Sequence, residues 1–483
     1  MKAKPVLHTL GAFLFILGLL MAVPLGCSLY YGERDAQGFA LSFLITSGVG
    51  FALYLAGKPR GGEILLGHRE GFLIVSAGWV LASFFGGLPY LLHGALPSLT
   101  DAYFETMSGF TTTGATVITK IEALPHGILL WRSMTQWLGG MGIIVLSVAV
   151  LPFLGVGGRQ LFKAELPGPV KDKLEPRIVE TARSLWIVYG IITVAGFIFL
   201  LFGGMSVFDA VNHIFCAMAT GGFSTKDSSI AWFGSAYIDG VLVAFMLIAG
   251  MNFTLHYQVL TGNFRNIHKN NELRFFLGTV LLATVLITVD LRLHVFEEVG
   301  KAFRYALFQA ASIMTTTGFV TDNFANWPAF SQIILLLLMF VGGSAGSTGG
   351  GIKCVRLLLI LKDSYRELYR LIHPHAVTQV KLDHLSVSPE VMKSIWGFFA
   401  LYLCLAVLAT VLMSSLGLDM LTSFASVAAT IGNVGPGLGL VHPATTYAEV
   451  PALGKWILSF CMLIGRLEIY TVLVLLMPEF WKK

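Results

Sequence analysis

The chain alternates between long apolar runs and short polar stretches. The apolar runs are each about 20 residues or longer, which is the length that an α-helix needs to cross the hydrocarbon of a bilayer. Ten runs of this kind can be delimited, so the pattern predicts an all-α polytopic membrane protein with ten spans. The predicted spans are 6–31, 37–56, 71–93, 125–153, 184–204, 234–260, 275–294, 330–360, 393–416 and 455–478.

The last eight spans follow a repeated order. Four times a span is followed by a short amphipathic segment, a polar glycine-centred stretch and a second span, with a period of about 100 residues. Irregular backbone at membrane depth is tolerated only where it lines water or is buried in protein. The order therefore predicts four pseudo-symmetric helix–pore-loop–helix repeats around one pore, preceded by a two-helix hairpin. The predicted boundaries are 1–60 for the hairpin and 61–160, 161–265, 266–385 and 386–483 for repeats 1 to 4.

Composition supports the membrane class. Apolar residues make up 55% of the chain and charged residues 12%, whereas a soluble domain carries about 25% charge. The net charge of +5 follows loop topology and is not evidence for nucleic-acid binding. Five scattered cysteines without CxxC spacing support neither a disulfide framework nor a zinc site. No catalytic cluster stands out, so we expect neither an enzyme nor a bound cofactor.

Lysine and arginine mark the cytoplasmic side of a membrane protein. Six basic segments fall on one side if the chain has ten spans, including Lys2 and Lys4 at the start and Lys482 and Lys483 at the end. Both termini are therefore predicted to be cytoplasmic, with the glycine stretches toward the outer side. A cleaved signal peptide is the alternative for the first run, but that run lacks a small-residue cleavage site.

The glycine stretches carry the candidate chemistry. Backbone carbonyls and threonine hydroxyls are hard oxygen ligands that can replace the water shell of K⁺, and glycine allows the φ > 0 that turns successive carbonyls toward one axis. A single Thr-Thr-Thr-Gly could be a surface turn, but four related copies favour a filter. The predicted potassium selectivity filter comprises Thr112, Thr113, Gly114, Thr220, Gly221, Gly222, Thr316, Thr317, Gly318, Asn433, Val434 and Gly435.

The four copies are unequal. The first and third are complete, whereas Asn433 and Val434 stand in the fourth where threonines stand elsewhere. Its register has two solutions: counting from Asp419 points to Gly432, and matching Gly-Pro points to Gly435, which we prefer. One glycine ring predicts fewer strong ion sites and looser discrimination against Na⁺ or Rb⁺ than a longer filter gives.

The span 330–360 is interrupted by glycines. A phosphate-binding loop requires Gly-Lys followed by Ser or Thr, and Ile352 separates Gly351 from Lys353 here. The segment is predicted to form a flexible loop in the ion path below the filter, and a kinked helix with closely packed small residues is the alternative. The predicted gating residues are Gly346, Ser347, Thr348, Gly349, Gly350, Gly351 and, in the last span, Arg466.

Arg466 and Glu468 are ionisable residues inside an apolar span, where charge is costly and usually functional. A pore-facing Arg466 would act as an electrostatic barrier near the ion path. The alternative is an internal ion pair that holds helices together, with Glu468 as the partner of Arg466. His213, just before the second glycine stretch, is expected to be a satisfied packing histidine.

These motifs resemble the Trk/Ktr/HKT superfamily of potassium transporters, closest to the bacterial TrkH/TrkG membrane subunits. The resemblance covers almost the whole chain. It implies potassium uptake across the bacterial inner membrane, a homodimer, an intramembrane gating loop with an arginine at the position of Arg466, and a cytoplasmic nucleotide-binding regulatory subunit of the NAD/ATP type. The matching stretches are 108–116, 221–225, 317–319 and 433–437.

Two questions stay open at this stage. The basic segments 154–182 and 361–392 are candidate docking surfaces for the regulator, but their charge also fits topology alone. Symport of K⁺ with H⁺ or Na⁺ is the alternative to channel-like conduction. It would normally use a membrane carboxylate, and Glu468 is the acid that the sequence places inside a span.

Overall fold

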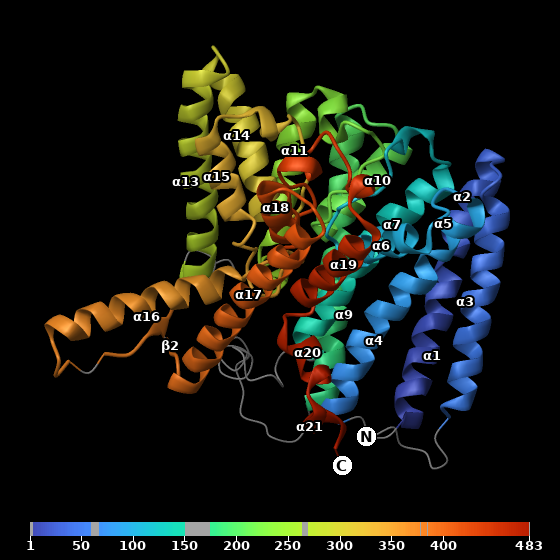
Figure 1. Cartoon of the computed structure of the whole chain (residues 1–483), viewed down its shortest axis with the longest axis horizontal. Helices are drawn as coiled ribbons and strands as arrows, with labels where there is room; N and C mark the ends of the chain where they lie inside the picture. The colour runs from blue at the N-terminus through green and yellow to red at the C-terminus, as the bar shows by residue number, and fades with distance from the viewer. Residues whose placement is uncertain are drawn as a thin grey trace.

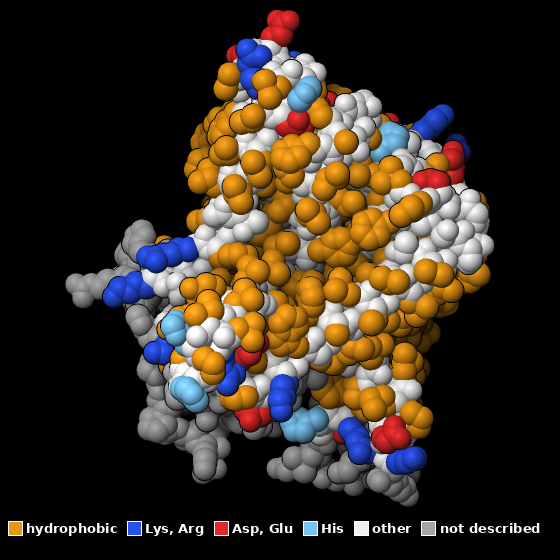
Figure 2. All heavy atoms as spheres, turned by 60° about the vertical axis from the view of Figure 1, so that its left-hand side comes forward, with side chains coloured by type: hydrophobic (Ala, Val, Ile, Leu, Met, Phe, Trp, Pro, Cys, Tyr) orange, Lys and Arg blue, Asp and Glu red, His pale blue; other side chains and the backbone are white. Residues whose placement is uncertain are grey.

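The computed structural model describes residues 3–58, 67–149, 174–262, 269–376, 378–383 and 385–482; the side chains of 145–149 and 174–179 are not described. The described chain is almost entirely helical, with one antiparallel pair of two-residue strands, β1 (Lys381–Leu382) and β2 (Leu385–Ser386). Hydrophobic side chains cover the middle of the face in Figure 2, and charged side chains gather toward its two ends. The all-α membrane fold is thereby confirmed.

The predicted N-terminal hairpin is formed by α1 (Ala3–Leu20), α2 (Ala22–Tyr31) and α3 (Ala36–Ala56), at one side of the molecule (Figure 1). Glycines let α1 and α3 approach closely: a Cβ on Gly50 would lie 2.4 Å from the Phe15 nitrogen. One on Gly11 would lie 2.3 Å from the Tyr54 nitrogen. Close backbone contact through small residues is a common way to join helices in a membrane.

Four units follow (Figure 1), and in each a helix of 12 to 16 residues, which we call the short helix, precedes the glycine stretch. The short helices are α6 (Leu99–Phe110), α10 (Val207–Ala219), α14 (Val299–Met314) and α18 (Met420–Ile431). The others are α4 (His68–Gly86), α5 (Leu88–His93) and α7 (His126–Ala149) in the first unit, α9 (Leu174–Phe202), α11 (Ala236–Gly250) and α12 (Phe253–Leu260) in the second, α13 (Asn271–His294), α15 (Ala329–Leu338) and α16 (Cys354–Ile372) in the third, and α17 (Pro389–Ser415), α19 (Ala452–Arg466), α20 (Tyr470–Leu473) and α21 (Pro478–Trp481) in the fourth.

The first turns of the short helices explain the ambiguous register of the fourth glycine stretch. Ser98 and Ser206 are N-caps, and their side chains accept from the backbone N–H of Asp101 and Asp209 three residues later. Asp419 is itself an N-cap and accepts from Thr422 N. Asp419 therefore matches Ser98 and not Asp101. Counting from Asp419 as though it matched Asp101 shifts the register by three residues, from Gly435 to Gly432.

The spans are less regular than predicted. In the described residues six helices are long and apolar enough to cross a membrane, and up to eight if each of two bent pairs counts as one span. The predicted continuous spans 234–260 and 455–478 are wrong, because α11 and α12 meet at 103° and α19 meets the segment 470–476 at 111°. The predicted span 330–360 is also broken: α15 ends at Leu338, and α16 begins only at Cys354.

Candidate functional site: a ring of four glycine loops

Each short helix ends in the same turn. Its last residues are followed by a residue with left-handed φ, and two positions later comes a glycine that is also left-handed. The non-glycine residues are Thr112, Thr220, Thr316 and Asn433, with φ between 53° and 59°, and the glycines are Gly114, Gly222, Gly318 and Gly435, with φ between 76° and 99°.

The turn is closed by a pair of hydrogen bonds that ends many helices. In the first unit Thr112 N donates to Gly109 O and Thr113 N to Ser108 O, at 2.9 and 2.8 Å. The same pair recurs at the equivalent residues of the other three units. A β-branched residue rarely adopts this backbone, and such strain, roughly 1–3 kcal/mol per residue, tends to accumulate at functional sites. The equivalence also assigns Gly435, the preferred choice, to the position of Gly114.

The four glycines, which we call the glycine ring, pack against one another in cyclic order. A Cβ on Gly114 would lie 2.0 Å from Gly221 O, one on Gly222 2.1 Å from Thr317 O, and one on Gly318 2.0 Å from Val434 O. The ring closes because a Cβ on Gly435 would lie 2.6 Å from Thr113 O. Each glycine thus contacts the carbonyl that precedes the next glycine, so sequence-distant stretches meet at one place with backbone oxygens between them.

Side chains outside the ring hold it differently in each unit. Thr111 Oγ1 lies 2.8 Å from Thr113 Oγ1, and the third unit repeats this between Thr315 and Thr317. The hydroxyls of the predicted threonine ligands Thr113 and Thr317 therefore form hydrogen bonds within their own loops. In the fourth unit Asn433 Nδ2 donates to Thr113 Oγ1 and to Met462 O, both at 3.0 Å.

A hollow of about 150 Å³ lies on one side of the ring, and all four ring glycines line it. Its other lining residues come mostly from the segments that follow the glycines, such as Thr116, Ser224 and Val320.

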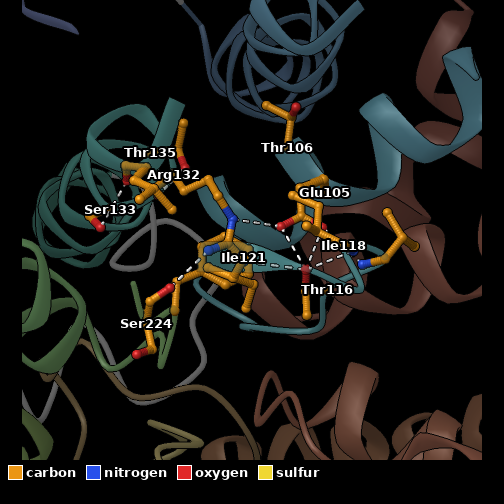
Figure 3. A network of polar contacts seen from close by, with 12 residues as sticks. Glu105, Thr106, Thr116, Ile118, Ile121, Arg132, Ser133, Thr135 and Ser224 are labelled. Atoms are coloured by element: carbon orange, nitrogen blue, oxygen red, sulfur yellow. Dashed lines mark hydrogen bonds and ion pairs between the residues drawn. The ribbon is translucent and has the colours of Figure 1, made fainter. Parts of the chain in front are cut away.

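A buried ion pair that sequence reasoning missed stands beside the hollow (Figure 3). Arg132 Nε of α7 lies 2.9 Å from Glu105 Oε1 of α6, and neither side chain is exposed beyond 1%. Arg132 Nη1 also donates to Ser224 O, and Glu105 accepts from Thr116 Oγ1 and Val117 N. The pair therefore joins α6 and α7 to the loops after the first and second glycines. The signals available in the sequence were Arg132 inside the predicted span 125–153 and Glu105 in the short segment before the first glycine stretch.

The glycine-rich loop, residues 339–353, contacts the other side of the ring. Gly350 N donates to Thr316 Oγ1 at 2.7 Å, and a Cβ on Gly350 would lie 2.6 Å from Gly432 O. Thr348 Oγ1 donates toward Met218 O and Ala249 O of the second unit. The predicted break in the span is confirmed, and Ser344, Ser347 and Thr348 of the loop are at most 3% exposed.

Two cationic side chains bind this loop. Arg466 Nη1 donates to Thr348 O at 2.6 Å, and Lys353 Nζ donates to Gly349 O. Glu468, expected to pair with Arg466, instead forms an ion pair with Arg356. The reason is that the chain turns sharply after α19, where Glu468 and Ile469 both have positive φ, which separates the two side chains.

The histidine of the second unit is satisfied as expected. His213 lies 2.7 Å through Nδ1 from Asp209 O and 2.9 Å through Nε2 from Ser224 Oγ. Among the described residues, no group of three or more His, Cys, Asp or Glu side chains could hold a metal ion. The oxygens at the ring are backbone carbonyls and threonine hydroxyls.

Apolar spans, four helix–loop units and an oxygen-bearing ring together define a polytopic membrane transport protein. The chain belongs to the TrkH family of cation transport proteins, whose family model matches residues 36–483. It is 44% identical to the Trk system potassium uptake protein TrkH of Halomonas elongata over all of both chains. It is 38% identical to TrkG of Escherichia coli over 99% of both.

The fold agrees with a solved structure. The crystal structure of the potassium transporter TrkH from Vibrio parahaemolyticus superimposes with a TM-score of 0.91 and 40% identity, covering 100% of both chains. The resemblance inferred from the motifs is thus confirmed, and the family is one of transporters and not of enzymes.

Proposed function

We propose that this protein takes up K⁺ across the bacterial inner membrane by conduction through the glycine ring. The observation that carries the proposal is the closed cyclic contact of the four glycines with the carbonyls of Thr113, Gly221, Thr317 and Val434. Carbonyl oxygens replace the hydration shell of K⁺. The short helices also end at the ring, so the negative ends of their dipoles favour a cation there. The relatives named potassium uptake proteins support this choice of ion.

The glycine-rich loop is the gate in this proposal. It lies against the ring on the side opposite the hollow, and Arg466 and Lys353 place two positive charges beside it. In this proposal a cation leaving the ring meets both the loop and this charge, which together close the pathway. Opening requires the loop to leave Thr316 and Arg466.

Removing the arginine tests the gate. Arg466→Ala deletes the bond to Thr348 O and one positive charge, so we expect faster basal K⁺ flux with normal insertion into the membrane. Flux into vesicles normalised to inserted protein measures this. Unchanged kinetics in a correctly folded variant would contradict a gating role for Arg466.

Proton- or sodium-coupled symport remains the alternative mechanism. Besides Glu468, whose side chain is 11% exposed, the described segments bury acids that the sequence did not suggest, including Glu105 and Asp290. Each has a local partner: Arg132 for Glu105, Ser331 for Asp290 and Arg356 for Glu468. None of these carboxylates contacts a ring glycine, and this favours conduction without a coupled ion.

The test of the function is ion flux through purified protein in liposomes. We expect K⁺ uptake down its gradient with or without a pH gradient, and slower uptake of Na⁺. Gly318→Ser should lower the K⁺/Na⁺ ratio about tenfold, because a side chain at φ +80° would meet Val434 O and left-handed strain alone costs roughly 1–2 kcal/mol. Gly417→Ser is the matched control, since Gly417 has φ +89° and open space around it. Flux strictly dependent on a proton gradient would support symport instead.

The proposal includes two partners and an orientation. The termini and the end of the molecule that carries α16 and α21 (Figure 1) face the cytoplasm, as the basic segments predict. A cytoplasmic nucleotide-binding subunit of the NAD/ATP type docks there, with 361–392 as its candidate surface; most of the other candidate, 154–182, lies outside the described residues. A homodimer forms through the uncovered face of α16. The filter, gate and domain roles given to individual residues belong to this proposal.

A further inference from the structure

The second loop of the ring lacks the side chains that brace the others. Where the first and third loops carry a pair of bonded threonines, the second has Ala219 and Gly221. Thr220 Oγ1 donates only to Ala219 O. Two consecutive glycines, Gly221 and Gly222, then form the most flexible backbone in the ring.

One side chain from α7 compensates for this. Gln136 is completely buried, and its Nε2 donates to Gly221 O at 2.7 Å. Its Oε1 accepts from Phe223 N at 3.1 Å. The Gln136 amide therefore hydrogen-bonds to the backbone on both sides of Gly222. The two bonds hold this left-handed glycine in place. The fit is close, since a Cβ on Gly221 would lie 2.4 Å from Gln136 Cδ.

The hydrogen bond from Gln136 also makes the Gly221 carbonyl different from the other three ring carbonyls. Gly221 O is the oxygen that contacts Gly114, equivalent to the carbonyls of Thr113, Thr317 and Val434. No hydrogen bond to those three carbonyls is found among the described residues. An amide N–H on Gly221 O occupies one of its two lone-pair directions and holds the oxygen at a fixed distance from its neighbours.

We propose that Gln136 is a positioning residue for ion selectivity, which sets the place and strength of the second-loop carbonyl. This rests on the proposed function of the ring. A ring whose oxygens are held apart at a fixed spacing discriminates between ions of different radius, and a loop free to relax inward accommodates Na⁺ as well. Gln136 thus does for the second loop what threonine pairs do for the first and third.

The test compares two substitutions. Gln136→Met has similar length and removes both bonds, while Gln136→Glu keeps an acceptor for Phe223 N and loses the donor to Gly221 O. We expect both to lower the K⁺/Na⁺ flux ratio in liposomes by about 3- to 10-fold, the range that the loss of one net hydrogen bond gives. The ratio is measured within one preparation, so a smaller folded fraction does not change it.

Ser133→Ala is the matched control on the same helix, because the Ser133 hydroxyl bonds to Leu129 O of its own helix and should leave the ratio unchanged. A wild-type ratio in Gln136→Glu would overturn the proposal, even if Gln136→Met fails to assemble. A changed ratio in Gly318→Ser with wild-type values in both Gln136 variants would reject the role of Gln136 alone. An unchanged ratio in all three variants would reject the proposed filter itself.

Discussion

At the scale of single residues, the ring is built from unlike parts that reach one backbone geometry. Two loops use threonine pairs, one uses Gln136 and one uses Asn433, yet all four place a left-handed residue two positions before a left-handed glycine. Side chains outside the ring therefore determine how firmly each carbonyl is held. In our proposal, ion selectivity therefore depends on these side-chain hydrogen bonds as well as on the glycines.

The buried pair of Glu105 and Arg132 is one such brace, and it carries a stability prediction. Arg132→Met leaves the Glu105 carboxylate buried without its cation, which typically costs about 3–5 kcal/mol. We expect a clear fall in the Tm of the purified protein. The double variant Glu105→Gln/Arg132→Met leaves no buried charge at this pair and should recover much of the loss. Equal Tm values for the single and double variants would show that the charge pair is not what stabilises these loops.

The sequence indicated which four glycine stretches are related, but it did not indicate the side chains that hold them. Thr-Thr-Thr-Gly is local, so its glycines and its register could be found by comparing copies along the chain. Gln136 and Arg132 act across the fold on Gly221 and Ser224. Nothing in their own neighbourhood distinguishes them from polar residues that face another helix, because their function arises only when α7 packs beside the second loop.

At the scale of elements, three membrane segments are broken near the ring: α11–α12, the glycine-rich loop and α19–α20. The breaks contact one another. Ser344 N donates to Gly250 O at the first break, and Thr348 O accepts from Arg466 at the end of α19. Each break frees backbone groups that the other breaks satisfy, which is how irregular backbone is accommodated at membrane depth. The three breaks form one polar layer below the ring.

Only one of these breaks could be predicted. Six glycines between 342 and 351 interrupt any helix, whereas 234–260 and 455–478 are long and mostly apolar and therefore predict unbroken spans. Met251–Asn252 and Glu468–Ile469 break because tertiary contacts offer partners there. Phe253 N, for example, donates to Gly346 O of the glycine-rich loop at 3.1 Å. Local helix propensity does not reveal such partners.

The contact between loop and ring predicts a link between gate and filter. Thr316→Val keeps the β-branched shape and removes the acceptor for Gly350 N. We expect basal K⁺ flux without a regulator to rise about 3- to 5-fold, since one net hydrogen bond is worth about 1 kcal/mol. Thr112→Val is the matched comparison, because the Thr112 hydroxyl has no hydrogen-bond partner among the described residues. Equal basal flux in the two variants would show that this bond does not hold the gate.

At the scale of the whole molecule, α16 is an element that leaves large apolar side chains uncovered. Figure 1 shows it extending away from the body of the protein. Its inner side is held by α17, where Trp396 Nε1 donates to Asp363 Oδ2 at 2.9 Å. Large apolar side chains on the remaining surface are exposed, including Leu361 at 52%, Leu368 at 62% and Ile372 at 74%. An apolar surface of this kind marks an interaction site.

A second copy of the chain is the partner that we predict for this surface. In a variant with the exposed Cys404 changed to Ser, Leu368→Cys should cross-link to its copy in intact membranes with a short bifunctional reagent. Ile333→Cys on α15 is the matched control, since Ile333 is 56% exposed but lies on a different helix. The cross-linked product should have twice the mass of the chain and should form in dilute proteoliposomes as well. If Leu368→Cys links no more than Ile333→Cys, the apolar face of α16 contacts lipid or the regulatory subunit, and the dimer must form elsewhere.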